Sequence, residues 1–460
     1  MTAIDEIQIE EVSDAERIEL LRDLLARHDG ERLARLLDEL ALSEALREIL
    51  ELSWEERAQM LYLLPADIAA ALIEEAPSEL AAELVERLEA YKAAEIIDEL
   101  DSDVQADVIG ELEEDNAEAI LAEMDEEDAA DVRRLAAYED DTAGGLMAAE
   151  TFTFSSSDTV AQVLRRLTDG DEDFERYRGQ HPYVIDGNDQ VVGVVSLRSL
   201  LTSSRGARLA QIMVGPMTVR VDVLLDELRD IFDKHPFLGM PVVEADGSLV
   251  GVVSRAAVDE AVLKRAESDS LKMQGLVGDE LRSMPLILRS RRRLAWLSTN
   301  IVLNIVAASV ISAYEQTLAA VIAIAVFLPM VSDMSGCSGN QAVAVTMREL
   351  SLGLVRPVDV VRVWWKEISV GVINGCVLGV LIGIVAWTWK GNAYLGLVIG
   401  LALALNTMIS VTIGGVVPLL LKRWGQDPAV ASGPLLTTVT DVAGFFLVLS
   451  LATLFMPLLT

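Results

Sequence analysis

Five apolar stretches in the carboxyl-terminal part of the chain constrain its fold more than any other feature. A transmembrane helix needs about 20 mostly apolar residues to cross the hydrocarbon core of a bilayer. Helices also satisfy every backbone polar group within one segment, as lipid requires. The sequence therefore predicts an all-α membrane domain of five transmembrane helices over residues 291–460. The predicted spans are residues 294–314, 317–346, 367–389, 393–421 and 429–458.

Charge is concentrated in the rest of the chain. The 460 residues carry a formal net charge of -36 although 52% of them are hydrophobic, and acidic residues dominate from Met1 to about Leu281. This acidic part argues against nucleic acid as a partner, because phosphate binding needs clustered Lys and Arg; it favours metal cations. Cys337 and Cys376 are the only cysteines, too few for a disulfide framework or a thiolate zinc site.

Basic residues near the ends of the spans predict how the chain crosses the membrane. Cytosolic loops carry an excess of Lys and Arg, so these clusters belong in the cytosol. The amino terminus lacks the basic region and apolar run of a signal peptide and is expected in the cytosol. Five spans then place the carboxyl terminus outside. The clusters are Arg289, Arg291, Arg292 and Arg293 before the first span, Arg348, Arg356, Arg362 and Lys366 after the second, and Lys422 with Arg423 after the fourth.

Residues 1–140 are predicted to form an acidic, all-helical regulatory domain. Apolar residues recur there at helical spacing, and short turns with Pro, Asp or Ser interrupt them, as at Pro65 and Asp101. Similar helix-turn units recur, which predicts an α-helical superhelix. The many carboxylates on its outer faces have two interpretations: a charged surface that only contacts solvent, or a surface that senses a metal ion.

Residues 141–263 contain short β-rich runs that alternate with helices, and this α/β module occurs twice. Each copy has an Asp/Gly turn before its second strand, at residues 186–189 and 246–247, and a helix after the following Ser. The duplication resembles a tandem pair of CBS domains, regulatory modules that often bind adenine nucleotides. Ser199 and Ala257 stand where nucleotide-binding members have an Asp, so adenine nucleotide binding is doubtful. A dimerising scaffold without a ligand is the alternative.

Two polar sites inside the predicted spans are candidates for carrying an ion. Asp441 lies well inside the last span, and an intramembrane carboxylate by default faces a bundle interior or water. A purely structural Asp is the alternative. Residues 332–341 combine Asp333 with Gly336, Gly339 and other small residues, which predicts a loosened helix with exposed carbonyl oxygens. Such oxygens beside one carboxylate suit Mg²⁺, because this ion keeps most of its waters.

The order of domains and several motifs resemble the MgtE family of magnesium channels across nearly the whole chain. The resemblance implies a homodimer with a pore between the subunits, where Asp441 holds a hydrated Mg²⁺ beside Asn340, Gly336 and the main chain of Thr437. Asp333 departs from the family, which has a small residue there, and would strengthen cation attraction or alter selectivity. The matching motifs are Thr142–Met147 (TAGGLM), Gly339–Gln341 (GNQ), Asp427–Ala429 (DPA), Ser432–Leu435 (SGPL) and Asp441 itself.

The resemblance also implies regulation and a location. In the family, Mg²⁺ bound between acidic faces of the helical domain, the CBS domains and a connecting helix closes the channel. The connecting helix is expected here at residues 264–290, with few acidic residues, so regulation is expected to be weaker or to use other carboxylates. The chain is expected in the inner (plasma) membrane of a bacterium, in contact with membrane lipid. The candidate regulatory carboxylates are Asp98, Asp101, Asp103, Glu267 and Asp269.

Two rival functions stay open: a coupled secondary transporter of divalent cations, and a membrane sensor that conducts no ion. An enzyme is not expected, because no nucleophile motif or phosphate loop occurs and His28, His181 and His235 are scattered. The sequence leaves the choice among Mg²⁺, Mn²⁺, Co²⁺ and Ni²⁺ open. The expected fold class is multidomain: an all-α superhelix, an α/β CBS pair and an all-α membrane domain.

Overall fold

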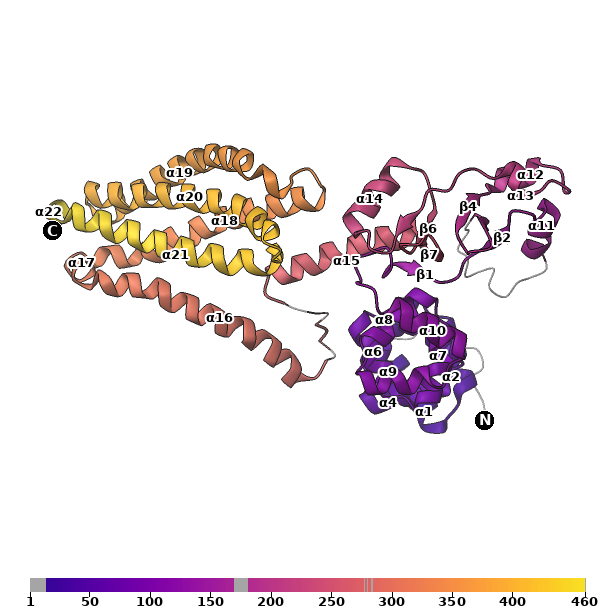
Figure 1. Ribbon diagram of the computed structural model, residues 1–460. Coiled ribbons are helices and arrows are strands. Elements are labelled where there is room, and N and C mark those ends of the chain that lie inside the picture. Colours follow the sequence, from indigo (N-terminus) through magenta and orange to yellow (C-terminus); the bar gives the residue numbers. More distant parts are fainter. Residues whose placement is uncertain (1–13, 169–180, 277, 279, 283, 460) are drawn as a thin grey trace. The chain divides into compact units, whose positions relative to one another are not determined.

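The computed structural model describes residues 14–168, 181–276, 278, 280–282 and 284–459. The chain divides into two compact units, Met1–Lys264 and Arg265–Thr460. The first unit contains a helical domain and two small sheets with their helices, and the second contains the long apolar helices (Figure 1). The multidomain fold class expected from the sequence is confirmed.

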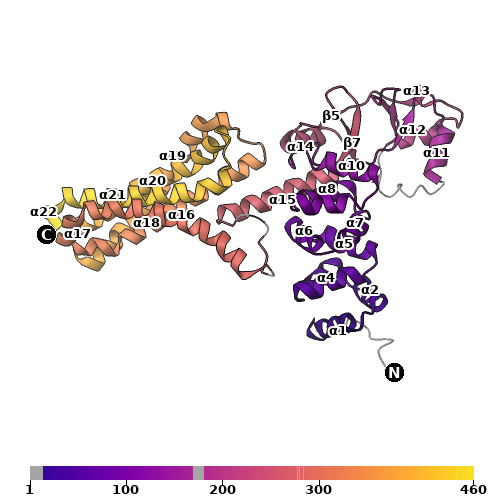
Figure 2. The ribbon, with the colours of Figure 1, turned by 60° about the horizontal axis from the view of Figure 1, so that its bottom comes forward.

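Short helices of 8 to 14 residues build the helical domain. Helices two apart in sequence pack on each other, for example α3 on α5, α5 on α7 and α6 on α8, so the chain winds into the stack that Figure 2 shows. The helices are α1 (Asp14–Arg27), α2 (Gly30–Asp38), α3 (Leu42–Leu50), α4 (Trp54–Leu63), α5 (Ala66–Glu75), α6 (Ser78–Glu86), α7 (Ala90–Ile97), α8 (Ser102–Gly110), α9 (Glu114–Leu121) and α10 (Glu126–Leu135).

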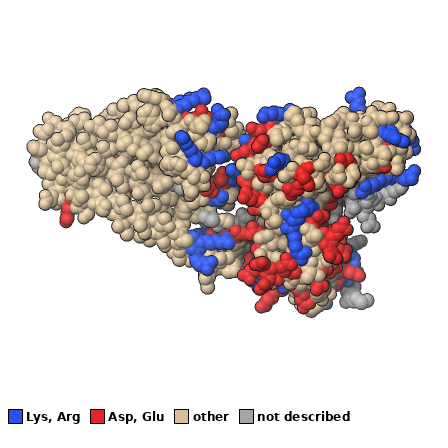
Figure 3. All heavy atoms as spheres, in the orientation of Figure 1, with Lys and Arg blue, Asp and Glu red and all other residues tan. Residues whose placement is uncertain are grey.

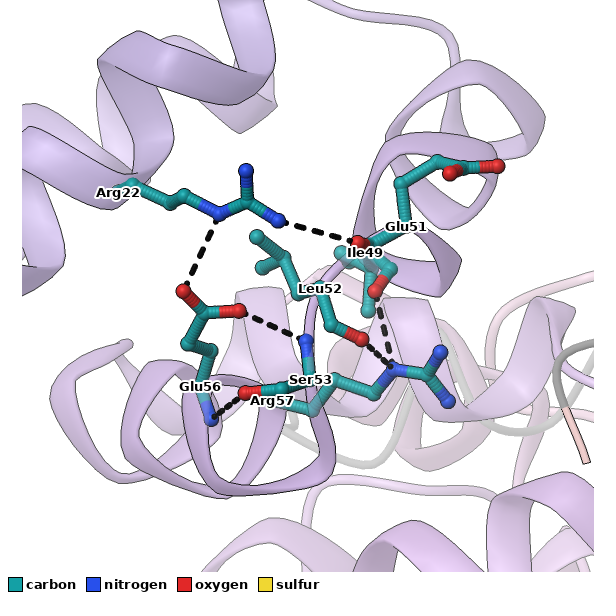
Figure 4. A network of polar contacts seen from close by, with 7 residues as sticks. All are labelled: Arg22, Ile49, Glu51, Leu52, Ser53, Glu56 and Arg57. Atoms are coloured by element: carbon teal, nitrogen blue, oxygen red, sulfur yellow. Dashed lines mark hydrogen bonds and ion pairs between the residues drawn. The ribbon is translucent and has the colours of Figure 1, made fainter. Parts of the chain in front are cut away.

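Polar side chains close the turns between these short helices. Ser53 and Glu56 form a reciprocal capping box at the start of α4. The buried Arg57 donates to the main-chain oxygens of Ile49 and Leu52, 3.1 and 3.0 Å away (Figure 4). One of these carbonyls is in the last turn of α3 and the other is in the turn that follows it, so Arg57 ties the end of this nine-residue helix to α4.

Two sheets of the same topology follow. In each, a parallel strand pair continues into an antiparallel hairpin: β2-β3-β4 in the first sheet and β5-β6-β7 in the second, where β1 also pairs with β7. The strands are β1 (Met147–Ala148), β2 (Thr153–Ser155), β3 (Tyr183–Ile185), β4 (Val191–Val194), β5 (Val219–Arg220), β6 (Gly239–Val243) and β7 (Leu249–Ser254). The helices are α11 (Val160–Thr168), α12 (Leu197–Thr202), α13 (Leu209–Ile212), α14 (Leu225–Lys234) and α15 (Arg255–Met273).

The second unit contains five helical segments that are long and apolar enough to cross a membrane, as the sequence predicts. Helix α20 is the most buried of them and contacts α18, α19 and α21. The segments are α16 (Leu286–Ala313); η3 (Ile322–Val326) with α18 (Leu328–Ser351); η4 (Pro357–Asp359) with α19 (Val360–Lys390); α20 (Ala393–Arg423); and α21 (Pro428–Leu454). The short helices α17 (Glu315–Ala320) and α22 (Met456–Leu459) lie outside these segments.

The connecting helix is shorter than predicted. Helix α15 ends at Met273 instead of continuing to residue 290, and α16 starts at Leu286. Gly275 and Gly278 both adopt positive φ, at 82° and 81°, a conformation that glycine tolerates and that commonly ends a helix. Gly275 ends α15, with the main-chain nitrogen of Leu276 bonded to Leu271 O, and Gly278 turns the chain again before α16.

The prediction of a loosened helix at residues 332–341 is wrong. These residues lie within α18, which is continuous from Leu328 to Ser351, and the irregular segment precedes it at η3. A Cβ at Gly339 would collide with Ser410 Oγ and lie 2.9 Å from Leu436, so this glycine allows close helix packing and does not unwind the chain. The Pro just before the predicted break, Pro329, is in the first turn of α18, where proline is tolerated.

Candidate functional site

Asp441 lies 13 residues after the first residue of α21, near the middle of this 27-residue helix. Its side chain is half-buried, and Ser332 of α18 donates a hydrogen bond from its hydroxyl to Asp441 Oδ1. Among the described residues, Ser332 is the one hydrogen-bonding side chain that Asp441 has. One carboxylate oxygen is thus held by the protein, and the second is left to bind a ligand.

The other predicted pore residues lie on the same two helices. Asp333 and Asn340 have exposed side chains on α18, and Thr437 is exposed on α21, one helical turn before Asp441. Gly336 faces α21, because a Cβ there would lie 3.9 Å from Thr440 Oγ1. The structure therefore gathers these residues around the α18–α21 contact, although it gives no hydrogen bond between Asp333 and Asp441.

Buried polar residues on α20 were missed by the sequence analysis. Asn406, Thr407 and Ser410 are fully buried, and Ser410 donates to the carbonyl of Ser335 on α18 at 2.6 Å. The sequence could have indicated them, because three polar residues within about one turn of an apolar span predict hydrogen bonds between transmembrane helices. These buried polar residues of α20 pack against α18, one of the two helices that form the Asp441 site.

The candidate regulatory carboxylates are divided between the two units. Asp98 and Asp101 cap the end of α7 and the start of α8, and Asp103 follows in the first turn of α8. Glu267 and Asp269 lie on the part of α15 that belongs to the second unit. Among the described residues, no group of three or more His, Cys, Asp or Glu side chains is arranged to hold a metal ion.

A crowded group of carboxylates that the sequence analysis missed lies in the first unit. The protein atoms packed around Asp107 desolvate its carboxyl, although the side chain still reaches solvent, and its pKa is raised to about 6. Lys264 opposes this rise in the pKa, and Asp103 and Asp140 contribute to it. Lys264 also donates to Ser78 Oγ at 2.8 Å. Desolvation is the main cause of the raised pKa, and the neighbouring carboxylates Asp103 and Asp140 add a smaller repulsion that a bound cation would relieve.

The end of α15 contacts the start of α21 within the second unit. Lys272 Nζ lies 3.1 Å from Asp427 Oδ2, and Met273 packs against the cluster that contains Leu436 of α21. Burial raises the pKa of Asp269, and the charge of Asp427 raises it further. One of the predicted regulatory carboxylates is therefore electrostatically coupled to the amino terminus of the helix that carries Asp441.

The chain has helical and α/β domains first and then five apolar helices with a half-buried carboxylate. This combination defines a multidomain integral membrane protein of the ion-transport class. Comparison with known proteins supports this class over most of the chain. A family model described as a divalent cation transporter (MgtE) matches residues 328–451, a model of the MgtE intracellular N domain matches 40–141, and CBS domain models match 143–206 and 209–264.

Relatives of known name identify the family. The magnesium transporter MgtE of Bacillus subtilis is 32% identical over 326 residues, which cover 70% of this chain and 72% of that protein. The magnesium transporter MgtE of Thermus thermophilus is 34% identical over 332 residues, which cover 71% and 72%. The chain belongs to the MgtE family, as its motifs predict, and members of this family are transporters and not enzymes.

One similar solved structure contains a bound nucleotide. It is described as the cytosolic domain of the Mg²⁺ channel MgtE in complex with ATP, with a TM-score of 0.48 and 31% identity, and the match covers 53% of this chain and 99% of that one. In this chain the Ser199 hydroxyl is 2.8 Å from Ser196 Oγ, and Ala257 has no side-chain oxygen. The weak nucleotide binding expected from Ser199 and Ala257 stays a prediction.

Proposed function

We propose that this chain is a magnesium channel in which a hydrated Mg²⁺ is held near Asp441 between two copies of the chain. The observation that carries the proposal is the half-buried Asp441 carboxylate in the middle of α21, with one oxygen bonded by Ser332. A carboxylate at this depth is costly unless it faces other protein or water. Mg²⁺ suits it, because that ion keeps several waters and needs few protein charges.

The exposed polar residues beside Asp441 support a second copy of the chain. Asp333, Asn340 and Thr437 are exposed on helices that are otherwise apolar enough to span a membrane. Lipid would leave these polar groups without partners, whereas a second copy would cover them and bring a second Asp441 to the same ion. The dimer therefore doubles the number of carboxylates that one chain supplies to the ion.

Charge at the helix ends supports the proposed orientation. Figure 3 shows Lys and Arg gathered at one end of the second unit, whose remaining surface is largely uncharged. Arg348 lies in the last turn of α18 and Lys422 in the last turn of α20, and cytosolic ends of transmembrane helices carry such an excess of basic residues. The basic end is proposed to face the bacterial cytosol, with the carboxyl terminus outside.

Purified protein in liposomes is expected to pass Mg²⁺ driven by its own gradient. A pore between two chains needs no co-transported ion, so Mg²⁺ entry should not change when proton and sodium gradients are removed. The measurement is an internal Mg²⁺-sensitive dye together with single-channel recording in a planar bilayer. Protein-free liposomes are the control.

The rival functions give different results in the same experiment. A coupled transporter would show Mg²⁺ entry that depends on a second ion gradient and would give no unitary currents. A sensor that conducts no ion would match protein-free liposomes. Either result would end the channel proposal.

We also propose that cytosolic Mg²⁺ closes the pore by binding carboxylates of the first unit and of α15, among them Asp98, Asp101, Asp103, Glu267 and Asp269. The net charge of -36 and the carboxylates Asp103 and Asp140 that interact with Asp107 support this proposal, because a divalent cation would relieve the repulsion between carboxylates. Bound Mg²⁺ then favours the more compact of two states.

Millimolar Mg²⁺ is expected to protect the helical domain from limited proteolysis, and a chelator should remove this protection. A potassium salt at equal ionic strength separates binding from charge screening. Changing Asp98, Asp101 and Asp103 together to Asn should weaken the protection. The matched control replaces Glu113, Glu114 and Asp115 at the start of α9 with their amides. Equal protease cleavage with Mg²⁺ and with chelator would exclude this form of gating.

A further inference from the structure

Asn406 of α20 is fully buried in the membrane unit and contacts both helices of the Asp441 site. Its side-chain nitrogen donates to the Thr440 carbonyl of α21 at 3.1 Å and lies 3.5 Å from the Val331 carbonyl of α18. One amide group on α20 thus bridges α18 and α21.

The two carbonyls precede the two residues of the site. Thr440 is followed by Asp441, and Val331 is followed by Ser332, whose hydroxyl donates to Asp441. A hydrogen bond to each carbonyl fixes the backbone from which each of these side chains extends. Asn406 therefore constrains the distance between Ser332 and Asp441 without touching either side chain.

Gly444, one turn after Thr440, makes room for this bridge. A Cβ at residue 444 would lie 2.7 Å from the side-chain nitrogen of Asn406, too close for either atom to stay in place. The position of Asn406 against α21 thus depends on a glycine.

Simple stabilisation does not account for the buried amide. The oxygen of Asn406 is buried and has no hydrogen-bond partner among the described residues, which costs free energy. The two carbonyls it contacts lie within α-helices, where each already accepts a backbone hydrogen bond. A leucine of similar size would avoid the unpaired oxygen, so folding alone does not require asparagine here.

We infer that Asn406 is a positioning residue of the ion site, which holds α18 and α21 so that Ser332 bonds one oxygen of Asp441 and leaves the other for the hydrated cation. This inference rests on the proposed function of Asp441. Loss of the bridge lets the two helices shift, and the carboxylate then meets the hydrated ion in a less defined position. Affinity and selectivity change, whereas the fold persists.

The test compares Asn406→Leu with Thr412→Val in the full-length protein in liposomes. Thr412 is a matched control because it lies on the same helix and its hydroxyl donates within that helix, to Met408 O at 2.6 Å. Asn406→Leu is expected to raise the Mg²⁺ concentration for half-maximal flux about three- to tenfold, the effect of losing one or two hydrogen bonds. The preference for Mg²⁺ over Ca²⁺ should fall, while the thermal midpoint of unfolding in detergent stays near the native one.

A second pair of variants tests the same bridge without leucine. Gly444→Ala should reproduce the flux effect, because the added methyl group displaces the Asn406 amide. In an Asn406→Ala background the same change should have no further effect, because the bridge is already absent. Additive effects of the two substitutions would overturn the inference, as would flux and selectivity in Asn406→Leu equal to those of Thr412→Val.

Failure of this inference is distinguishable from failure of the proposed function. If Asp441→Ala carries native flux, the proposed ion site is wrong and the positioning role is wrong with it. If Asp441→Ala abolishes flux while Asn406→Leu behaves as Thr412→Val does, the ion site stands and only the positioning role is excluded.

Discussion

Replacing Asp441 with alanine is expected to reduce Mg²⁺ flux into liposomes by at least about a hundredfold, since a contact to a charged group contributes about 1.5–3 kcal/mol and a dimer loses two of them. The substitution removes the carboxylate near the middle of α21 and leaves the Ser332 hydroxyl with no acceptor on this side chain. Asp333 on α18 is also a carboxylate, but Ser332 is hydrogen-bonded to Asp441 and holds that side chain in place. The measurement is dye-reported Mg²⁺ entry at equal protein density and matched orientation.

Two further variants show whether charge or shape at residue 441 matters. Asp441→Asn keeps the size of the side chain and removes its charge, so it should lose nearly as much flux as alanine if the ion is held electrostatically. Thr438→Val is the matched control, because Thr438 lies on the same helix and its hydroxyl donates to Pro434 O within that helix at 2.8 Å. Native flux in Asp441→Ala, with a correctly folded dimer, would assign Asp441 a packing role.

The parts of the fold that the sequence predicts are those set by local pattern. A span is recognised because lipid demands about 20 apolar residues in a row, whatever the helix later packs against. The hairpins are recognised for a similar reason: Gly247 adopts φ of 88° at the turn between β6 and β7, as Asp/Gly turns require. The sequence identifies Asp441 as a candidate because an acidic residue inside an apolar span is costly and usually has a functional role.

The parts that the sequence does not predict depend on neighbours far apart in the chain. Asn406 becomes a candidate only when α20 is seen to face the Val331 and Thr440 carbonyls. The pKa of Asp107 is raised first by desolvation, and the charges of Lys264 and Asp140, which are distant in sequence, lower and raise it respectively. The role of a glycine cannot be predicted from the sequence for the same reason. Gly275 ends a helix, whereas Gly339 lies inside a helix and allows a neighbouring helix to pack closely.

The two roles of glycine within α18 give the second large expected effect. Gly339→Ala should destabilise the protein by about 1–3 kcal/mol, the usual cost of overpacking, because the new methyl group would collide with Ser410 Oγ and lie 2.9 Å from Leu436. Gly336→Ala, three residues earlier, meets only Thr440 Oγ1 at 3.9 Å. It should leave stability unchanged or raise it by about 0.5–1 kcal/mol, because alanine favours a helix over glycine.

Thermal unfolding of the two variants in the same detergent measures this difference without reference to ion flux. A loss of stability at position 339 without a loss at position 336 is what a continuous helix packed against α20 and α21 requires, since only position 339 is crowded by other helices. If residues 332–341 were loosened in the membrane, neither methyl group would meet a fixed neighbour, and both substitutions would have similar small effects. Similar small effects would therefore support a loosened segment at residues 332–341. The candidate ion ligands would then be main-chain oxygens of α18 instead of side-chain oxygens.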